Sequence, residues 1–269
     1  MSSSNSQQPP TLPDSLHLEQ DGEIAILRLN RPAKRNALND ATVRAIGAFF
    51  SAIPEGVRAV VVHGAGEHFC AGLDLSELEE HDAVGGITHS RMWHRAFDEV
   101  QCGQVPVVTV MHGAVVGGGL ELACATHVRV AEPSAFYALP EGRHGIFLGG
   151  GGSVRITRLI GVSRLTDMML TGRVYDAQEG QQLALSHYLV EAGEGLKKGI
   201  ELAKKMAANA PMTNFALIHV LPRIAEMGQD QGLLTEALVA SIAQSAPEAK
   251  ERIQQFLSKQ AGTKVGSPK

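Results

Sequence analysis

The sequence predicts an α/β protein in which a mostly parallel sheet with crossover helices is followed by a helical C-terminal third. The first observation is a regular alternation of two kinds of segment up to about residue 139. Short apolar segments alternate there with segments whose apolar residues recur at helical spacing, which is typical of a parallel sheet. The second observation is a change after Gly152, where nearly every segment suits a helix and prolines separate the segments.

The predicted strands are short runs of apolar and β-branched residues that end at turn-forming residues. They cover residues 23–30, 58–63, 106–111, 128–131 and 136–139, and a further short strand lies around 188–190. The predicted helices carry apolar residues at three- and four-residue intervals, and the first one begins behind a good cap, Asn39 or Asp40. In the first half of the chain they cover 40–52, a stretch from near Ser76, about 88–101, and 120–125. In the second half they cover 153–160, 163–171, 177–185, 195–209, 212–226, 230–245 and 247–259.

Composition and charge exclude several classes of partner. Of the 269 residues, 44% are hydrophobic and 19% are charged, and the formal net charge is −4, which is ordinary for a globular protein. Lys and Arg are dispersed, which argues against nucleic acid as the main partner. No apolar stretch is long enough to span a bilayer, so no membrane partner is expected.

The N-terminus and the cysteines indicate the compartment. Residues 1–14 are rich in Ser, Gln and Pro and contain no basic residue, unlike a signal peptide or a mitochondrial presequence. We therefore expect a disordered tail on a cytoplasmic protein. Cys70, Cys102 and Cys124 have no metal-ligand spacing, and neither do the histidines. We expect buried thiols in a reducing compartment, and no metal site.

The stretch His112-Gly-Ala-Val-Val-Gly-Gly-Gly-Leu-Glu121 stands out, because it connects a predicted buried strand to a predicted helix. The first N–H groups of a helix have no partner inside it, and they carry the positive end of the helix dipole. Glycines at that position leave these donors uncovered, so an oxygen atom of another molecule can approach closely. With Glu121 directly behind, the pattern predicts a place that holds a developing negative charge beside an acid or base.

Two other glycine-rich segments do not predict nucleotide binding. His63-Gly-Ala-Gly66 follows a strand as a dinucleotide fingerprint does, but the third glycine is missing because Glu67 follows. The run of four glycines at 149–152 is followed by Ser153 and lacks the Lys-Ser/Thr ending of a P-loop.

Four segments together carry a family resemblance. Phe-Cys-Ala-Gly-Leu-Asp at 69–74, Gly-Gly-Gly-Leu-Glu at 117–121 and Pro-Glu-Gly at 140–142 occur in that order at the ends of predicted strands, after Asn-Arg-Pro-Ala-Lys-Arg-Asn-Ala-Leu at 30–38. In these segments the chain resembles the crotonase (enoyl-CoA hydratase/isomerase) superfamily, over about residues 20–260. The resemblance implies a crotonase-like ββα spiral with a helical C-terminal trimerisation region.

The resemblance also implies domain limits and assembly. It places the spiral core at 15–195 and the C-terminal helical region at 196–260, between disordered tails at 1–14 and 261–269. Proteins of this superfamily pack as trimers, often dimerised into hexamers, so a homotrimer or homohexamer is expected.

The implied site uses an oxyanion hole and two carboxyl groups. The superfamily holds the thioester carbonyl with two backbone N–H groups, and the matching positions are Leu73 and Gly118. The two acids of its hydratases match Glu121 and Glu141. Adding water across a double bond requires deprotonation of the water and protonation of a carbon atom, which two carboxyls beside one water can perform. We expect the helix dipole to favour ionised Glu121, the base, and desolvation to favour neutral Glu141, the proton donor.

The residues expected to contact coenzyme A come from the same resemblance. Arg35 and Ala37 lie where the superfamily meets the nucleotide end of CoA, and Ala71 matches a position whose backbone meets the CoA adenine. Leu73 is a further expected CoA contact. Phe256 and Lys259 lie where the last helix of the superfamily meets CoA, often the CoA of a neighbouring subunit. The expected partner is an acyl-CoA thioester substrate. No cofactor is expected, because coenzyme A is part of the substrate.

The sequence is compatible with three acyl groups on the substrate. Residues 138–153, with 64–76 and 90–94, resemble the subgroup that contains methylthioacryloyl-CoA hydratase, in which hydration is followed by thioester cleavage. Crotonyl-CoA and acryloyl-CoA are compatible with the same segments. Trp93 and His94 line the acyl pocket or serve in helix packing. The alternative from another class is a non-catalytic RNA- or CoA-binding relative, which the dispersed basic residues do not favour.

Overall fold

The computed structural model describes residues 12–77 and 82–259, with only the backbone of Lys259. Its larger sheet has the strand order β1-β2-β3-β4-β6-β9, and every neighbouring pair is parallel except the antiparallel pair β1–β2. A smaller sheet has the order β5-β7-β8. The strands of the larger sheet are β1 (Leu16–Asp21), β2 (Ile24–Leu29), β3 (Ala59–Gly64), β4 (Val107–Met111), β6 (Val128–Ala131) and β9 (Tyr188–Leu189). Those of the smaller sheet are β5 (Ala114–Val116), β7 (Phe136–Ala138) and β8 (Tyr175–Asp176).

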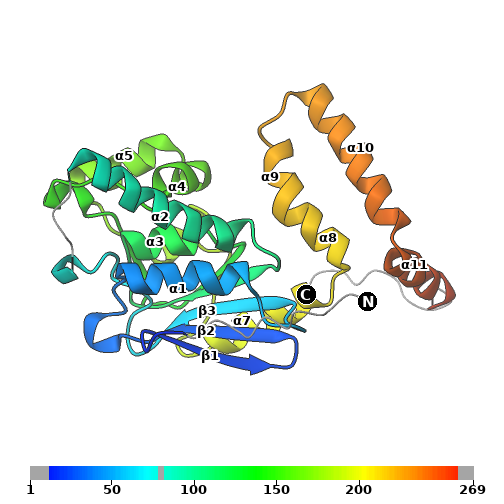
Figure 1. Ribbon diagram of the computed structural model, residues 1–269, viewed down its shortest axis with the longest axis horizontal. Coiled ribbons are helices and arrows are strands. Elements are labelled where there is room, and N and C mark those ends of the chain that lie inside the picture. The colour runs from blue at the N-terminus through cyan, green and yellow to red at the C-terminus, as the bar shows by residue number, and fades with distance from the viewer. Residues whose placement is uncertain (1–11, 78–81, 260–269) are drawn as a thin grey trace. The chain divides into compact units, whose positions relative to one another are not determined.

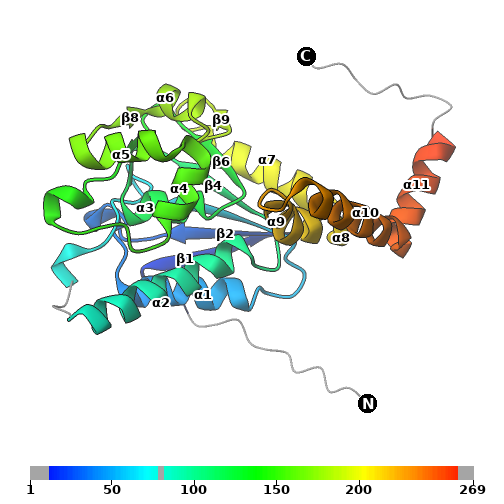
Figure 2. The same cartoon turned by 90° about the horizontal axis from the view of Figure 1, so that it is seen from above.

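The helices that follow these strands cover both faces of the larger sheet. They are α1 (Asp40–Ser51), α2 (Ala83–Gln101), α3 (Gly118–Cys124), α4 (Gly152–Ile160), α5 (Val162–Thr171), α6 (Ala177–Gln182) and α7 (Gly195–Ala207). Figure 1 shows α1 and α2 side by side, and Figure 2 shows the same pair from above. Short 3₁₀ turns occur at Pro32–Lys34, Leu75–Glu77 and Glu141–His144.

The inner strands of the larger sheet, β2, β3, β4 and β6, are mostly apolar because both of their faces are covered. Alternate residues of β3 belong to different cores: Val60 and Val62 pack with the α1 and α2 side chains, whereas Ala59 and Val61 pack with those of α7. This period of two follows from strand geometry. It fixes the register of the sheet, and therefore the positions of the loops that follow each strand.

The chain divides into two compact units, 1–207 and 208–269. The second unit contains α8 (Pro211–Phe215), a π-helical turn (Ala216–Val220), α9 (Leu221–Ile224), α10 (Gln229–Ser245) and α11 (Pro247–Lys259). The helix predicted at 212–226 is present, since these elements follow one another without a break from 211 to 224, but a π-helical turn interrupts its α-helical hydrogen bonding. Pro222 cannot donate a backbone hydrogen bond and so interrupts the regular pattern.

Other differences from the sequence prediction are local. The strands β1, β5 and β8 were not predicted, the strand at 136–139 pairs in the smaller sheet, and α2 begins earlier than expected because Asp82 caps it. The expectation of buried cysteines holds for Cys70 and Cys124 but is wrong for Cys102, which is exposed at the end of α2. Most of the predicted tails, residues 1–11 and 261–269, lie outside the described residues. Across residues 12–77 and 82–259, the helices are too short or too polar to cross a membrane.

The turn after β2 fixes the loop that leads to the candidate site. The Asn36 side chain accepts a hydrogen bond from Arg31 N (2.9 Å) and donates to the carbonyl oxygens of Ala65 (2.8 Å) and His68 (2.7 Å). The Arg35 carbonyl accepts from Ala71 N at 2.9 Å, so the turn and the loop at 70–74 are held together.

Replacing Asn36 with Ala is expected to lower the free energy of unfolding by about 2–3 kcal/mol, because three buried hydrogen bonds are lost together and two carbonyls lose a donor. Asn36 also has a φ of 56°, where Asn is better tolerated than Ala. Urea unfolding followed by circular dichroism measures the change. Arg35→Ala, at the exposed neighbouring position, is the control and should stay within about 0.5 kcal/mol. Equal effects of the two substitutions would contradict the role given to the Asn36 side chain.

Candidate active site

The candidate site forms where the loop at 70–73 runs beside the glycine turn at 117–119. Cys70 N donates to Ala114 O (2.9 Å), and Val116 N donates to Cys70 O (3.0 Å). The two backbones approach so closely that an ideal Cβ on Gly72 would lie 2.8 Å from Val116 O and 3.3 Å from Gly118 N. Gly72 also has a φ of 94°, so glycine is required there for two reasons.

Two backbone N–H groups beside this site have no hydrogen-bond partner in the described part of the chain. Among the described residues, neither Leu73 N nor Gly118 N donates a hydrogen bond. An ideal Cβ on Gly118 would lie 3.6 Å from Leu73 N, which shows how near the two segments are. On the opposite edge of the loop, Leu38 N donates to Gly72 O (2.7 Å) and Asp74 N to Leu38 O (2.8 Å). The structure therefore brings together the two positions expected to form an oxyanion hole.

Glu121 lies in the first turn of α3 and is 3% exposed. Its Oε1 accepts hydrogen bonds from Gly150 N (2.9 Å) and Gly152 N (2.7 Å). Burial raises the pKa of this carboxyl, and the two hydrogen bonds and the Arg155 guanidinium oppose that rise only in part. The expectation that the helix dipole sets the protonation of Glu121 therefore needs correction, because loss of solvent outweighs it.

Glu141 begins the 3₁₀ turn after β7 and is 8% exposed. Its Oε2 is buried and makes no hydrogen bond to any described residue. Burial raises the pKa of this carboxyl to about 7, and the nearby Glu121 charge acts in the same direction. The predicted preference of Glu141 for its neutral form agrees with this direction.

Both carboxyls and both donors line one cavity of about 460 Å³, here called the carboxylate cavity. Its walls are otherwise mostly apolar and include Ala71, Val116, Trp93 and Leu148. A concave, largely apolar volume with a few convergent polar groups is typical of a small-molecule site.

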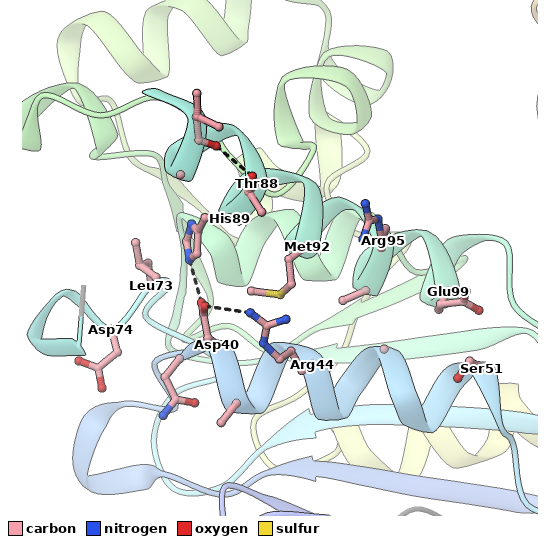
Figure 3. Close-up of a pocket in the computed structure, with 16 residues that line it drawn as sticks. Asp40, Arg44, Ser51, Leu73, Asp74, Thr88, His89, Met92, Arg95 and Glu99 are labelled. Atoms are coloured by element: carbon pink, nitrogen blue, oxygen red, sulfur yellow. Dashed lines mark hydrogen bonds and ion pairs between the residues drawn. The ribbon is translucent and has the colours of Figure 1, made fainter. Parts of the chain in front are cut away.

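A larger hollow of about 1040 Å³ lies between α1 and α2, here called the α1–α2 groove. Figure 3 shows its charged lining, with Asp40 directed toward both His89 and Arg44. Neither Glu121 nor Glu141 lines this groove, although Leu73 and His89 line both hollows. We therefore assign the chemistry to the smaller cavity despite its size.

The expected CoA-contacting residues are distributed unevenly. Ala71 and Leu73 line the carboxylate cavity, whereas Arg35 is exposed on the turn after β2 and Ala37 is buried beside it. Phe256 is on α11 in the C-terminal unit and is 53% exposed. Lys259 ends the same helix, and its side chain lies outside the described part of the chain.

The two candidate pocket residues on α2 line different hollows. Trp93 lines the carboxylate cavity, whereas His94 lines a different hollow together with Arg91, Asp98 and Arg155. The sequence pattern did not predict the Gly150 and Gly152 donors. The run of four glycines at 149–152 was the signal that could have indicated these donors. An ideal Cβ on Gly150 would lie only 2.9 Å from Glu121 Oε2, so a residue with a side chain does not fit there.

Comparison with known proteins points to one family. Residues 19–263 match the enoyl-CoA hydratase/isomerase family. The chain is 29% identical over 245 residues to the short-chain-enoyl-CoA hydratase of Clostridium acetobutylicum, covering 90% of this chain and 94% of that protein. It is 31% identical over 248 residues to the 2,3-dehydroadipyl-CoA hydratase of Escherichia coli K12, covering 91% and 96% of the two.

Solved structures agree with this comparison. A proposed enoyl-CoA hydratase from Rhodopseudomonas palustris CGA009 superposes with a TM-score of 0.91 at 55% identity, covering 94% of this chain and 98% of that chain. The enoyl-CoA hydratase of Bacillus anthracis gives a TM-score of 0.84 at 28% identity, covering 91% and 96%. The predicted α/β crotonase fold, with two sheets and C-terminal helices, is thus confirmed.

The raised pKa of Glu141 predicts a pH dependence of stability. The folded protein holds this proton to about pH 7, whereas the ordinary value is 4.5. The unfolded state therefore binds fewer protons between these values, and the contribution to stability that is present below 4.5 is lost as pH rises through about 7. Urea unfolding across this window should show that the Glu141→Gln protein lacks this part of the decline.

The control for the change of charge is Glu55→Gln, at an exposed position. Its profile should run parallel to that of the wild type. If the Glu141→Gln profile were also parallel to the wild type, Glu141 would not be the carboxyl that titrates near neutral pH.

Proposed function

The chain belongs to the enoyl-CoA hydratase/isomerase family of enzymes, and we propose that it adds water across the 2,3 double bond of short-chain 2-enoyl-CoA thioesters. One observation carries the proposal: two buried carboxyls line the same cavity as two backbone N–H groups that have no partner within residues 12–77 and 82–259. The names of the short-chain-enoyl-CoA and 2,3-dehydroadipyl-CoA hydratases among its relatives support the same reaction type.

In this proposal Leu73 N–H and Gly118 N–H hold the thioester carbonyl oxygen. Negative charge grows on that oxygen as water attacks C3 and an enolate forms. Donors fixed in advance by the backbone stabilise this charge without reorganisation, and one such donor typically contributes about 10²–10³ in rate. The rigid pairing of the loop at 70–74 with the turn after β2 supports this role, since it fixes Leu73 N in place.

The two carboxyls divide the proton transfers. Glu121 accepts both backbone hydrogen bonds on Oε1, which leaves Oε2 to accept a proton from the attacking water. Glu141, with its pKa near 7, carries the proton that C2 receives. Each positioned acid or base contributes about 10²–10⁴ in rate. In the reverse direction the two residues exchange their roles.

The proposed CoA contacts are Arg35, Ala37, Ala71 and Leu73, together with Phe256 and Lys259 of the C-terminal helix. The position of Leu73 on the cavity wall supports the thioester end of this path. Within the short acyl groups, crotonyl, acryloyl and methylthioacryloyl are the candidates. The segment 138–153 supports methylthioacryloyl-CoA, whose hydration would be coupled to thioester cleavage.

We also propose a homotrimer or homohexamer that forms through the C-terminal unit. Its helices expose many large apolar side chains, which a protein normally covers. Those of α10 and α11 include Leu233, Leu234, Leu238, Ile242, Phe256 and Leu257.

Glu121→Gln and Glu141→Gln are each expected to lower kcat for hydration of crotonyl-CoA by about 10²–10⁴-fold, because Gln cannot exchange the proton. Loss of the enoyl thioester absorbance measures turnover with crotonyl-, acryloyl- and methylthioacryloyl-CoA. Free thiol that appears only with the sulfur-bearing substrate would identify the coupled reaction. Glu55→Gln serves as the control. Wild-type turnover in both active-site variants would eliminate the two-carboxylate mechanism.

Light scattering after size-exclusion chromatography should give a native mass three or six times the 28.6 kDa of one chain. Replacing Leu234 and Leu238 together with Glu should reduce this mass to that of one chain, because charged groups cannot be buried in an apolar interface. Glu236→Gln, on the same helix, is the control. An unchanged mass in the double variant would place the interface elsewhere.

A further inference from the structure

We propose that Trp93 sets the upper limit on acyl-chain length, because its indole ring separates the carboxylate cavity from the α1–α2 groove. This inference rests on the proposed function, since it concerns which enoyl-CoA the same site accepts. It assigns a specificity-determining role to a residue that takes no part in the proton transfers.

The first observation is the contact between Trp93 and the glycine turn. Trp93 is 4% exposed, and an ideal Cβ on Gly118 would lie 2.8 Å from its Cζ3 and 3.2 Å from its Cη2. The edge of the indole is therefore pressed against the backbone of the residue that offers the Gly118 N–H. The Phe97 ring meets the indole at 5.6 Å between centroids and an interplanar angle of 71°, which holds it from the core side.

The second observation is the anchor on the other side of the ring. Trp93 Nε1 lies 3.4 Å from Asp40 Oδ1, a long hydrogen bond, and the same oxygen is 2.7 Å from His89 Nε2. Asp40 is the first residue of α1 and lines the groove, where Figure 3 shows it facing His89. The indole thus extends from α1 to the glycine turn.

The third observation is the way the two hollows divide the residues around them. Leu73 and His89 line both, so the two hollows are neighbours at these residues. Trp93 lines only the carboxylate cavity, whereas Asp40 and Met92 line only the groove. A chain that extends from a thioester held at Leu73 and Gly118 toward the groove would meet the indole.

The volumes indicate the consequence. The cavity that Trp93 lines has a volume of about 460 Å³, and the groove that its partner Asp40 lines has a volume of about 1040 Å³. A short acyl group is accommodated in the first alone. Replacing the indole with a smaller side chain joins the two volumes, so a longer chain gains a path without any change at Glu121 or Glu141.

The test compares crotonyl-, hexenoyl- and decenoyl-CoA in the wild type, Trp93→Leu and Trp93→Phe. We expect the ratio of kcat/KM for decenoyl-CoA over crotonyl-CoA to rise by about tenfold or more in Trp93→Leu. Trp93→Phe retains an aromatic ring, so its kcat/KM ratio should stay close to that of the wild type. The matched control is His94→Leu, the same substitution one residue along α2, where the side chain lines a different hollow. Its ratio should equal that of the wild type.

A second readout does not depend on catalysis. Binding of butyryl-, octanoyl- and decanoyl-CoA by titration calorimetry should show a preference for the short chain in the wild type and its loss in Trp93→Leu. If no variant hydrates any enoyl-CoA while this binding pattern appears, the proposed function fails and the chain-length role stands. If hydration proceeds but the chain-length ratios of wild type and Trp93→Leu agree, the inference is overturned and the proposed function stands.

Thermal unfolding checks that Trp93→Leu is folded, because it removes a buried side chain. Should it fail to fold, Asp40→Ala takes its place, since that change releases the indole from its anchor while the ring remains. A rise in the decenoyl-to-crotonyl ratio in Asp40→Ala would support the proposal, and an unchanged ratio would overturn it.

Discussion

The candidate site depends on two backbone segments that lie closer together than side chains allow. An ideal Cβ on Gly119 would lie 2.5 Å from Cys70 O, and one on Gly72 would lie 2.8 Å from Val116 O. Glycine at these positions lets the loop at 70–73 join the strand that leads to α3. The Leu73 and Gly118 N–H groups are therefore set by backbone pairing rather than by flexible side chains. Preorganisation of this kind is what stabilisation of a developing oxyanion requires.

The same close packing explains the protonation of the two carboxyls. Both are buried, so loss of water raises the pKa of Glu121 and of Glu141. Their partners differ: two backbone N–H groups and a nearby guanidinium favour the ionised form of Glu121, whereas Glu141 has a buried oxygen without a partner among the described residues. Two residues of one type thus acquire different surroundings, which is the condition for assigning them different proton-transfer roles.

The sequence predicted those parts of the molecule that depend on local pattern. The buried strands and most helices were predicted because their apolar periodicity is strong. In contrast, β1 was missed because most of its residues are polar and exposed, and β8 because its two residues, Tyr175 and Asp176, do not form an apolar run. Motif order identified four residues that line one cavity, Leu73, Gly118, Glu121 and Glu141. Contacts made by folding alone were not predictable: Asp40 and His89 are 49 positions apart, and nothing in either local sequence indicates the other.

Gly118 links the chemistry of the site to its selectivity. Its N–H and that of Leu73 have no partner among the residues that the structure describes, and its missing side chain is what allows the Trp93 ring to approach. Any side chain at this position would meet the indole at 2.8 Å and displace either the ring or the donor. Selection for a different acyl length therefore cannot act on the glycine turn without disturbing the proposed oxyanion hole. It can act on α2, where the ring is carried by a helix whose neighbouring residues do not hold the thioester oxygen. The proposed reaction and the proposed control of acyl length therefore depend on different elements, the glycine turn and α2.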